Sequence, residues 1–137
     1  MGGIVEARKL SDRQEIFRLL IYSAASLVTG DAFSVNKPLA AKLLKLKPNR
    51  RTMQLEKCFN DVISSLPPGA TIKDIDVLFN PDYKVDVMRI LIEANKKKPI
   101  SVIWPGRYEN GKLLYSEEPL LDYKAYNISD YDIYYVV

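Results

Sequence analysis

The chain has 137 residues, of which 47% are hydrophobic and 27% charged, with a formal net charge of +3 at pH 7. This composition predicts one globular domain over residues 1–137. The sequence has no histidine and a single cysteine, Cys58, which excludes Cys-His and Ser-His-Asp nucleophile systems and the usual soft ligand sets for zinc, iron and copper. We expect no catalytic residue of these kinds and no cofactor, although lysine, tyrosine, aspartate or glutamate could still act as acid or base and oxygen ligands for magnesium remain available.

The N-terminal part of the sequence has no pattern typical of export, and its longest apolar-rich stretch is Ile16 to Val28. That stretch contains Arg18 and is shorter than the roughly 20 residues of a membrane-spanning helix. We expect a cytoplasmic protein without membrane contact.

Two structures are open for the first part of the chain. Ile4 to Leu10 predicts a short N-terminal helix, and Ser11 followed by Gln14 resembles a capping box that would begin a helix running through Leu20 or beyond. The run from Phe17 to Tyr22 is instead short, apolar and followed by small residues, as in a buried strand. Periodicity does not decide between helix and strand over 16–22, and we favour the strand for a reason given below.

The middle of the chain predicts one strand and two helices. Ala32 to Asn36 alternates as a short strand, and Pro38 suits the first turn of a helix that ends before Pro48. The apolar stripe of that helix consists of Leu39, Leu43, Leu44 and Leu46. A second helix is predicted over Arg51 to Leu66 and is stopped by Pro67. Its expected inner face consists of Met53, Leu55, Phe59, Val62, Ile63 and Leu66.

The second half of the chain again alternates between segments with strand periodicity and segments with helix periodicity. Ile72 to Phe79 predicts a strand with the apolar end of a central parallel strand, and Asp82 to Lys97 predicts a helix. Ile100 to Trp104 and Tyr131 to Val137 predict further strands, and the Asn110–Gly111 dipeptide predicts a hairpin. Strands that alternate with helices predict an α/β fold, with right-handed crossovers and ligands at the carboxyl ends of the strands.

Three segments carry a resemblance to a known family. They are Asp76 to Leu91 (Asp-Val-Leu-Phe-Asn-Pro-Asp-Tyr-Lys-Val-Asp-Val-Met-Arg-Ile-Leu), Ile103 to Pro119, which contains Trp-Pro-Gly and then Leu-x-Tyr-x-Glu, and Asp122 to Tyr126. The chain resembles the BrxF-like proteins, small P-loop proteins of bacterial BREX phage-defence systems, most clearly from about Phe33 to Tyr126.

The resemblance implies a mostly parallel, three-layer P-loop NTPase-like sheet with a C-terminal β-hairpin. It also implies a role in antiviral defence, with larger defence-system proteins as partners. In a P-loop sheet the first strand leads into G-x-x-x-x-G-K-[ST] and a helix, which is why we favour a strand over Phe17 to Tyr22.

The phosphate-binding loop of that family is missing from this sequence. After Tyr22 comes the segment Ser23 to Gly30 (Ser-Ala-Ala-Ser-Leu-Val-Thr-Gly), whose one glycine is followed by Asp31, and the nearest lysine, Lys37, precedes Pro38. A P-loop surrounds phosphates with backbone N–H groups that glycines make accessible, and adds a lysine and a hydroxyl. The sequence therefore predicts that the usual grip on a triphosphate is lost.

The second nucleotide signature is an acidic residue at the end of an apolar strand, which helps to hold magnesium. The candidates for cofactor binding are Asp74 and Asp76, which strand spacing would place on one face. Lys73 stands where the resemblance would put the family's acid. The alternative is a surface ion network formed by the two aspartates and the lysine.

Basic side chains gather in the middle of the chain and again at Lys96 to Lys98. Arg50, Arg51 and Lys97 are therefore candidates for weak, salt-sensitive contact with DNA phosphates. The alternative is that these side chains form solvated helix faces, since the net charge is only +3.

Tyrosines crowd the last third of the chain. An aromatic body with a polar tip suits protein interfaces, so Arg107, Tyr108 and Tyr115 of the predicted hairpin region are candidates for partner contact. The alternative is that the rings cover the sheet edge within the monomer. The remaining tyrosines of this part of the chain are Tyr123, Tyr126, Tyr131, Tyr134 and Tyr135.

The sequence thus favours a non-catalytic or degenerate P-loop-like component of a BREX-type system that acts through protein–protein assembly. One alternative is a defence ATPase that binds ATP and magnesium through an atypical or partner-supplied phosphate loop. The other alternative is a nucleic-acid-binding adaptor.

Overall fold

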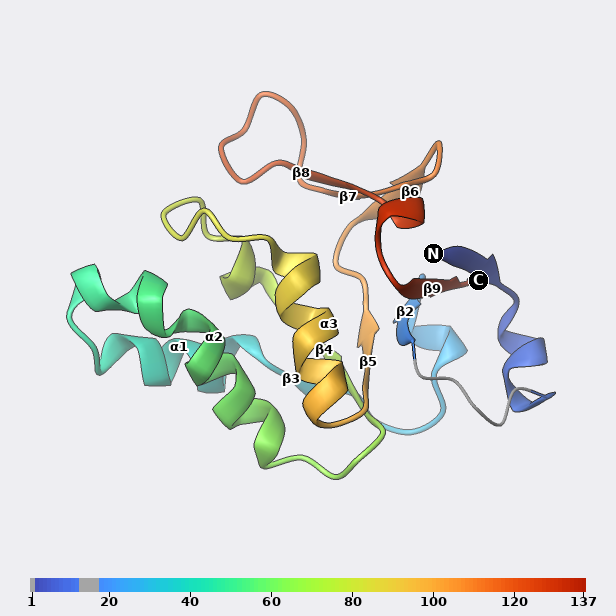
Figure 1. Cartoon of the computed structure of the whole chain (residues 1–137), viewed down its shortest axis with the longest axis horizontal. Helices are drawn as coiled ribbons and strands as arrows, with labels where there is room; N and C mark the ends of the chain where they lie inside the picture. Colours follow the sequence, from blue (N-terminus) through green and yellow to red (C-terminus); the bar gives the residue numbers. More distant parts are fainter. Residues whose placement is uncertain (1, 13–17) are drawn as a thin grey trace.

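The computed structural model of the protein describes residues 2–12 and 18–137. It is an α/β structure with a six-stranded, all-parallel sheet and a separate three-stranded antiparallel sheet (Figure 1). The α/β class, the parallel main sheet and the C-terminal hairpin are therefore confirmed. The main sheet has the order β1 (Gly3–Val5), β9 (Ile133–Val136), β2 (Leu19–Tyr22), β5 (Ile100–Ile103), β4 (Ala70–Lys73) and β3 (Phe33–Ser34).

The remaining elements connect these strands. The α-helices of the described residues are α1 (Asn36–Leu44), α2 (Pro48–Ser64) and α3 (Val87–Lys97). The small sheet consists of β6 (Arg107–Glu109), β7 (Lys112–Tyr115) and β8 (Lys124–Asn127). Single 3₁₀ turns complete the fold: η1 (Ala7–Asp12), η2 (Ala25–Leu27), η3 (Asp76–Phe79) and η4 (Ile128–Asp130).

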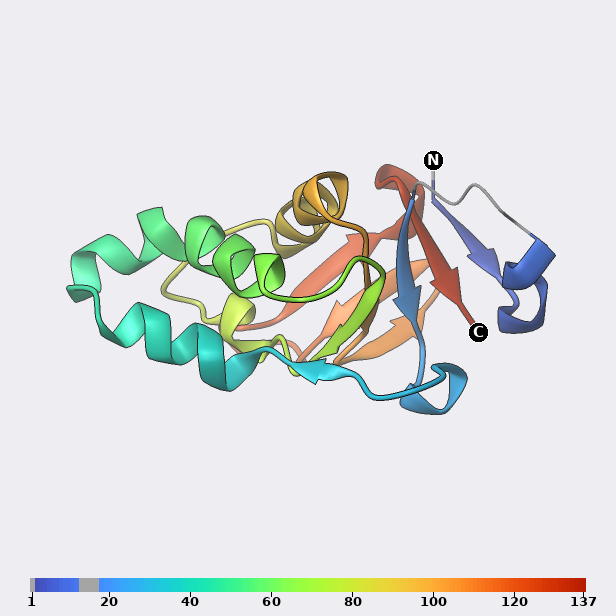
Figure 2. The same cartoon turned by 90° about the horizontal axis from the view of Figure 1, so that it is seen from below.

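Strand β2 lies in the interior of the main sheet, where Leu20 pairs with Tyr134 of β9 and with Ser101 of β5. The chain leaves β2 for the edge strand β3 and then returns towards β2 through β4 and β5. Right-handed crossovers in one direction lie on one face of a sheet, so α1, α2 and α3 share a face, and α3 contacts both β2 and β5 (Figure 2).

The two faces of the main sheet differ in burial. On the helical face Leu19 and Ile21 are buried, whereas on the opposite face Leu20 and Tyr22 are only half-buried. Among the described residues no α-helix covers that opposite face, so the three-layer arrangement expected from the resemblance is not found. The physical reason is length, because residues 23–32 must span about three strand spacings and return along the strand, and they accommodate only the turn η2.

The predicted strand from Ile72 to Phe79 is wrong from Asp74 onwards. β4 ends at Lys73, and Asp74 then has φ +53°, a left-handed conformation that ends an extended strand. The apolar run that follows forms η3, in which Leu78 and Phe79 are buried. A short continuous apolar run has the same pattern in a buried strand and in a buried helical turn, so the sequence did not distinguish them.

The N-terminal helix predicted over Ile4 to Leu10 is also wrong in its first part, because Gly3–Val5 pairs in parallel with β9. The 3₁₀ turn η1 begins only at Ala7. The strand predicted for the next segment is confirmed over Leu19–Tyr22. The part of that prediction at Ile16 and Phe17, like the capping partner Gln14, lies outside the described residues.

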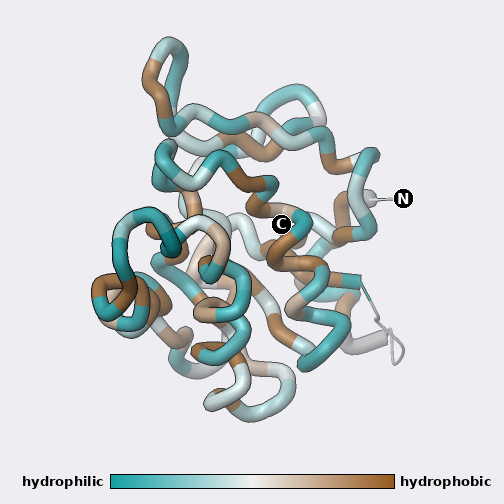
Figure 3. The backbone as a smooth tube through the Cα atoms, turned by 60° about the vertical axis from the view of Figure 1, so that its left-hand side comes forward, coloured by the Kyte–Doolittle hydropathy of each residue, from teal (hydrophilic) through white to brown (hydrophobic). Residues whose placement is uncertain are grey.

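Helices α1 and α2 are confirmed, but their apolar faces are narrower than expected. Leu39 and Leu43 of α1 are buried, as are Leu55 and Phe59 of α2. Two residues assigned to the inner faces instead point to solvent, since Leu44 is 69% exposed and Met53 is 80% exposed. The hydropathy-coloured tube in Figure 3 also shows an apolar stretch at the outer loop between β7 and β8, where Leu120 and Leu121 are exposed.

The small sheet lies above the carboxyl edge of the main sheet (Figure 1). Asn110 and Gly111 both have positive φ, so the predicted Asn-Gly hairpin turn between β6 and β7 is confirmed. Trp104, which follows β5, is buried and its Nε1–H donates to the Leu114 carbonyl of β7 at 2.9 Å. Strand β8, which was not predicted, is the third strand of this small sheet.

Candidate functional site

The carboxyl edge of the main sheet is the candidate site, since ligands of open α/β sheets bind outside the carboxyl ends of the strands. In this chain β2, β4 and β5 lead at that edge into Ser23, Asp74 and Trp104. The polar groups of the edge are gathered at the ends of β3 and β4, where a network of short hydrogen bonds forms.

Each aspartate of the network has its own partners. The Asp74 carboxylate accepts a hydrogen bond from the Ser34 hydroxyl at 2.7 Å. The Asp76 carboxylate accepts one from the Asn36 amide at 3.2 Å and one from the Tyr115 hydroxyl at 2.8 Å. Both aspartates are exposed, and their partners are hydroxyl and amide groups. These hydrogen bonds connect β3 to the turn after β4, and connect both α1 and β7 to η3.

The predicted geometry of the aspartate pair is wrong, because Asp74 and Asp76 do not lie on one face of a strand. Asp74 is in a left-handed turn and Asp76 begins η3. Lys73 is the last residue of β4 and is exposed, so the end of this strand carries a basic residue. Among the described residues no group of three or more histidine, cysteine, aspartate or glutamate side chains comes together to hold a metal ion.

Tyr115 is held inside the fold. Its ring stacks on Phe79 with centroids 3.8 Å apart and an interplanar angle of 6°. Burial raises the pKa of Tyr115 well above its ordinary value, and the hydrogen bond to Asp76 raises it further. The phenol donates a hydrogen bond to the Asp76 carboxylate and so positions it.

Three amides of the segment after β2 donate hydrogen bonds within the fold. The Ser23 amide donates to the carbonyl of Val136 at 2.9 Å, which extends the ladder with β9, and the Ser23 side chain hydrogen-bonds to Tyr135. The amides of Leu27 and Val28 donate within η2 at 3.2 and 3.1 Å. These N–H groups therefore do not converge on a common point in solvent, as the amides of a phosphate cradle do.

The other residues predicted to contact a partner in the hairpin region are also engaged. The Arg107 guanidinium donates to the Ser116 carbonyl at 2.8 Å and forms an ion pair with Glu109 at 3.4 Å. The ring of Tyr108 stacks on that of Tyr135 with centroids 4.8 Å apart. The rings thus cover the junction of the two sheets within the monomer, as the alternative interpretation of the tyrosines expected.

The basic candidates do not form one surface. Arg50 is exposed in the first turn of α2, whereas Lys97 is exposed at the last residue of α3. Figure 1 shows the start of α2 and the end of α3 as separate places in the molecule. Arg51 is half-buried, and its Nε–H donates to the carbonyls of Leu43 and Leu46 at 3.0 and 3.3 Å.

Sequence reasoning missed the partners of the aspartates. Ser34 and Asn36 lie two residues apart at the end of the strand predicted over Ala32 to Asn36, and alternation alone would have placed them on one face. That signal was present in the sequence. The pairing of β3 with β4, which sets Ser34 opposite Lys73, was not.

Comparison of the chain with protein-family models, with curated proteins and with solved structures gave no significant match. No helix among the described residues is long and apolar enough to cross a membrane. The BrxF-like resemblance stays a prediction.

Proposed function

We propose that this chain is a docking component of a BREX-type phage-defence assembly and that it does not hydrolyse nucleotides itself. The proposal rests on the carboxyl edge, where the amides of Ser23, Leu27 and Val28 donate within the fold and the small sheet lies above the strand ends. A parallel sheet followed by a hairpin is in keeping with a P-loop-like origin. A degenerate member of such a family retains the scaffold and loses the phosphate grip.

We favour a docking surface outside the tyrosine-rich hairpin. Tyr108 and Tyr115 are half-buried and stacked on other rings. Large apolar side chains are instead exposed at Leu44, the last residue of α1, and at Leu120 and Leu121 in the loop between β7 and β8. Leu120 and Leu121 are neighbours in the chain, and grouped apolar side chains mark interaction surfaces more often than scattered single residues do.

Calorimetric titration with ATP and magnesium tests the first half of the proposal. We expect no saturable heat from the purified chain, and the Asp76→Asn variant serves as the matched control because it removes one carboxylate from the edge. A dissociation constant in the micromolar range, weakened in the variant, would contradict the proposal and favour the ATPase alternative.

A phage-challenge experiment tests the second half. In a host that carries the defence locus, deletion of the gene should abolish resistance. The variants Asp74→Asn and Asp76→Asn should retain resistance, because these carboxylates brace the fold and do no chemistry. Loss of resistance in a variant that folds and is produced at normal levels would show that the carboxylates act directly.

A further inference from the structure

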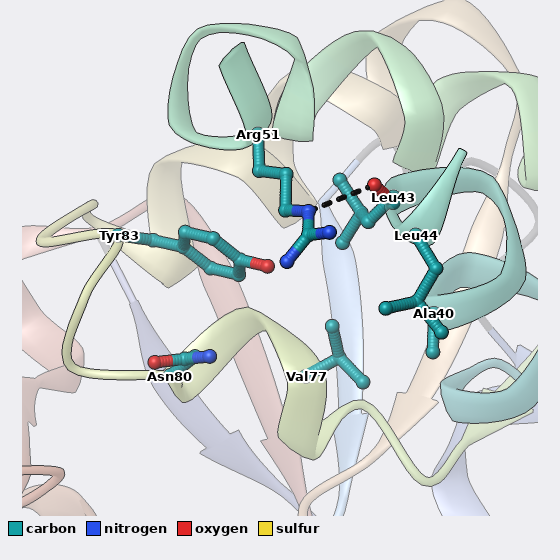
Figure 4. A pocket seen from close by; sticks show the side chains of 7 residues that line it. All are labelled: Ala40, Leu43, Leu44, Arg51, Val77, Asn80 and Tyr83. Carbon is teal, nitrogen blue, oxygen red and sulfur yellow. Dashed lines mark hydrogen bonds between the residues drawn. The ribbon is translucent and has the colours of Figure 1, made fainter. Parts of the chain in front are cut away.

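A pocket of about 240 Å³ lies between the helical corner and the segment that leads into α3 (Figure 4). Its wall is contributed by α1, by α2 and by η3 with the residues that follow it. The lining residues are Ala40, Leu43, Leu44, Arg51, Val77, Asn80 and Tyr83. Drug-sized ligands need about 300 to 1,000 Å³, so a pocket of this size suits a single side chain.

Arg51 is the charged group of this pocket. Its Nε is occupied by the carbonyls of Leu43 and Leu46, which fixes the plane of the guanidinium. Figure 4 shows the terminal nitrogens of Arg51 in the space between Leu43, Val77 and Tyr83. A half-buried guanidinium held in this way presents a planar pair of donors, the arrangement that recognises a carboxylate through two parallel hydrogen bonds.

Two further polar groups face the same space. The side-chain oxygen of Asn80 accepts a hydrogen bond from the Asp82 amide at 3.0 Å, which orients the side chain so that its NH₂ group points to the pocket (Figure 4). The hydroxyl of Tyr83, a buried residue, points towards the Arg51 guanidinium. The guanidinium and the Asn80 NH₂ group are donors only, so a matching ligand supplies acceptors.

The α1–α2 side of the pocket carries only basic charge. None of the lining residues is acidic, and the sequence has no aspartate or glutamate between Asp31 and Glu56. The same stretch, which forms α1 and the start of α2, contains Lys37, Lys42, Lys45, Lys47, Arg50 and Arg51. The opposite wall has two exposed aspartates, Asp76 beside Val77 and Asp82 between Asn80 and Tyr83, so basic charge predominates and a ligand with negative charge is attracted to the α1–α2 side.

The rest of the wall is apolar. Leu43 is buried in the wall, whereas Leu44, at the edge of α1, is 69% exposed and contributes to the lining. An exposed leucine beside a guanidinium suits an acidic side chain with apolar neighbours. A nucleic-acid backbone offers phosphates but no apolar side chains to cover Leu44, so a peptide complements both features of the corner.

We propose that this pocket binds the carboxylate of an aspartate or glutamate in an acidic, apolar-flanked segment of a partner protein. The carboxylate accepts from the terminal nitrogens of Arg51, and the flanking apolar side chains cover Leu44. This inference rests on the docking role proposed above and names the chemistry of the partner.

Fluorescence polarisation with labelled peptides tests the proposal. The probes are ten-residue peptides with one glutamate flanked by leucine, isoleucine or phenylalanine in a Gly-Ser background, each paired with the same peptide carrying glutamine. We expect at least one glutamate peptide to bind, and its glutamine partner to bind at least tenfold more weakly because a charge-assisted pair is lost.

Variants of the chain locate the binding. Leu44→Asp places a negative charge at the edge of the pocket on an exposed side chain and should weaken binding at least tenfold without unfolding the protein. Met53→Asp is the matched control, since Met53 is also exposed, lies in α2 and does not line this pocket. Arg51→Lys keeps the charge but loses the planar pair of donors and should weaken the glutamate peptide more than the glutamine peptide.

Three results would overturn the inference. They are no binding of any glutamate peptide, equal binding of glutamate and glutamine peptides, and equal effects of Leu44→Asp and Met53→Asp. A 20-base-pair DNA duplex is tested in parallel at low salt, and binding of the duplex but not of the peptides would assign the corner to nucleic acid. If ATP does not bind and phage resistance survives Leu44→Asp, the docking role stands but uses another surface.

Discussion

Tyr126 is a polar side chain in the core between the two sheets. It is 7% exposed, and its hydroxyl oxygen accepts a hydrogen bond at 3.1 Å from the Val87 amide at the start of α3. Its ring meets those of Trp104 and Tyr131 edge to face. Burial raises the pKa of Tyr126 to about 12, although the bond from the Val87 amide acts in the opposite direction.

This raised pKa makes the fold sensitive to alkali. The unfolded chain loses the phenolic proton near pH 10, whereas the folded chain holds it until about pH 12. The unfolded state therefore binds fewer protons in this window, and the free energy of unfolding falls as pH rises from 10 to 12. One such group contributes a slope of up to about 1.4 kcal/mol per pH unit, measurable by urea unfolding at stepped pH.

The Tyr126→Phe variant isolates this effect. It should lose roughly 1 to 3 kcal/mol at neutral pH, because the Val87 amide is left without its partner, and should show a shallower decline above pH 10. Burial also raises the pKa values of Tyr131 and Tyr135, so some decline remains. Tyr123→Phe, at a half-buried tyrosine, is the control, and an identical slope in both variants would refute the assignment.

At the scale of an element, α3 differs from α1 and α2 because a side chain caps its N-terminus. Asp86 is the N-cap of α3, and its carboxylate accepts from the Arg89 amide at 3.1 Å. The same carboxylate accepts from the Tyr131 hydroxyl at 3.2 Å. The N-cap positions of α1 and α2 make no such side-chain bond. Asp86 thus joins the helix that packs on β2 and β5 to the segment that leads into β9.

We predict that Asp86→Ala destabilises the protein by about 1 to 2 kcal/mol, since a lost cap alone costs about 0.5 to 2 kcal/mol. Asp86→Asn retains an acceptor for the Arg89 amide and should cost less. Chemical denaturation monitored by far-UV circular dichroism measures both. Equal losses in the two variants would mean that the charge of Asp86, and not its cap, is what matters.

At the scale of the whole molecule, the two sheets meet at Trp104 and Gly106. Trp104 is the single tryptophan of the sequence, and its indole N–H donates to β7. A Cβ atom at Gly106 would lie 1.9 Å from the Leu114 carbonyl oxygen, so only glycine permits this close approach. The main sheet and the small sheet therefore share one packed junction and should unfold together.

We predict that tryptophan fluorescence and far-UV circular dichroism report the same unfolding transition. Gly106→Ala should lower the stability by more than about 3 kcal/mol, a loss typical of overpacking against backbone. Gly3→Ala, where an added Cβ meets no heavy atom within 4 Å, should be close to neutral. A fluorescence change that precedes the loss of secondary structure would show that the small sheet detaches as a separate unit.

The sequence by itself determined the elements whose signals are local. The periodicity of α1, α2 and α3, the Asn110–Gly111 turn and the missing lysine and glycines after Tyr22 all follow from neighbouring residues. Local patterns of this kind depend on backbone geometry and solvation within a few residues, so they do not depend on how the strands pair.

Only the tertiary structure decided what the side chains meet. The stacking of Tyr115 on Phe79, the exposure of Met53 and the donor-lined pocket around Arg51 join segments far apart in the chain. Parallel strands pair only through long crossovers, so strand order and register are set by the packing of the whole core. Side chains in similar local sequences can therefore be buried, hydrogen-bonded or exposed, depending on which distant segments pack against them.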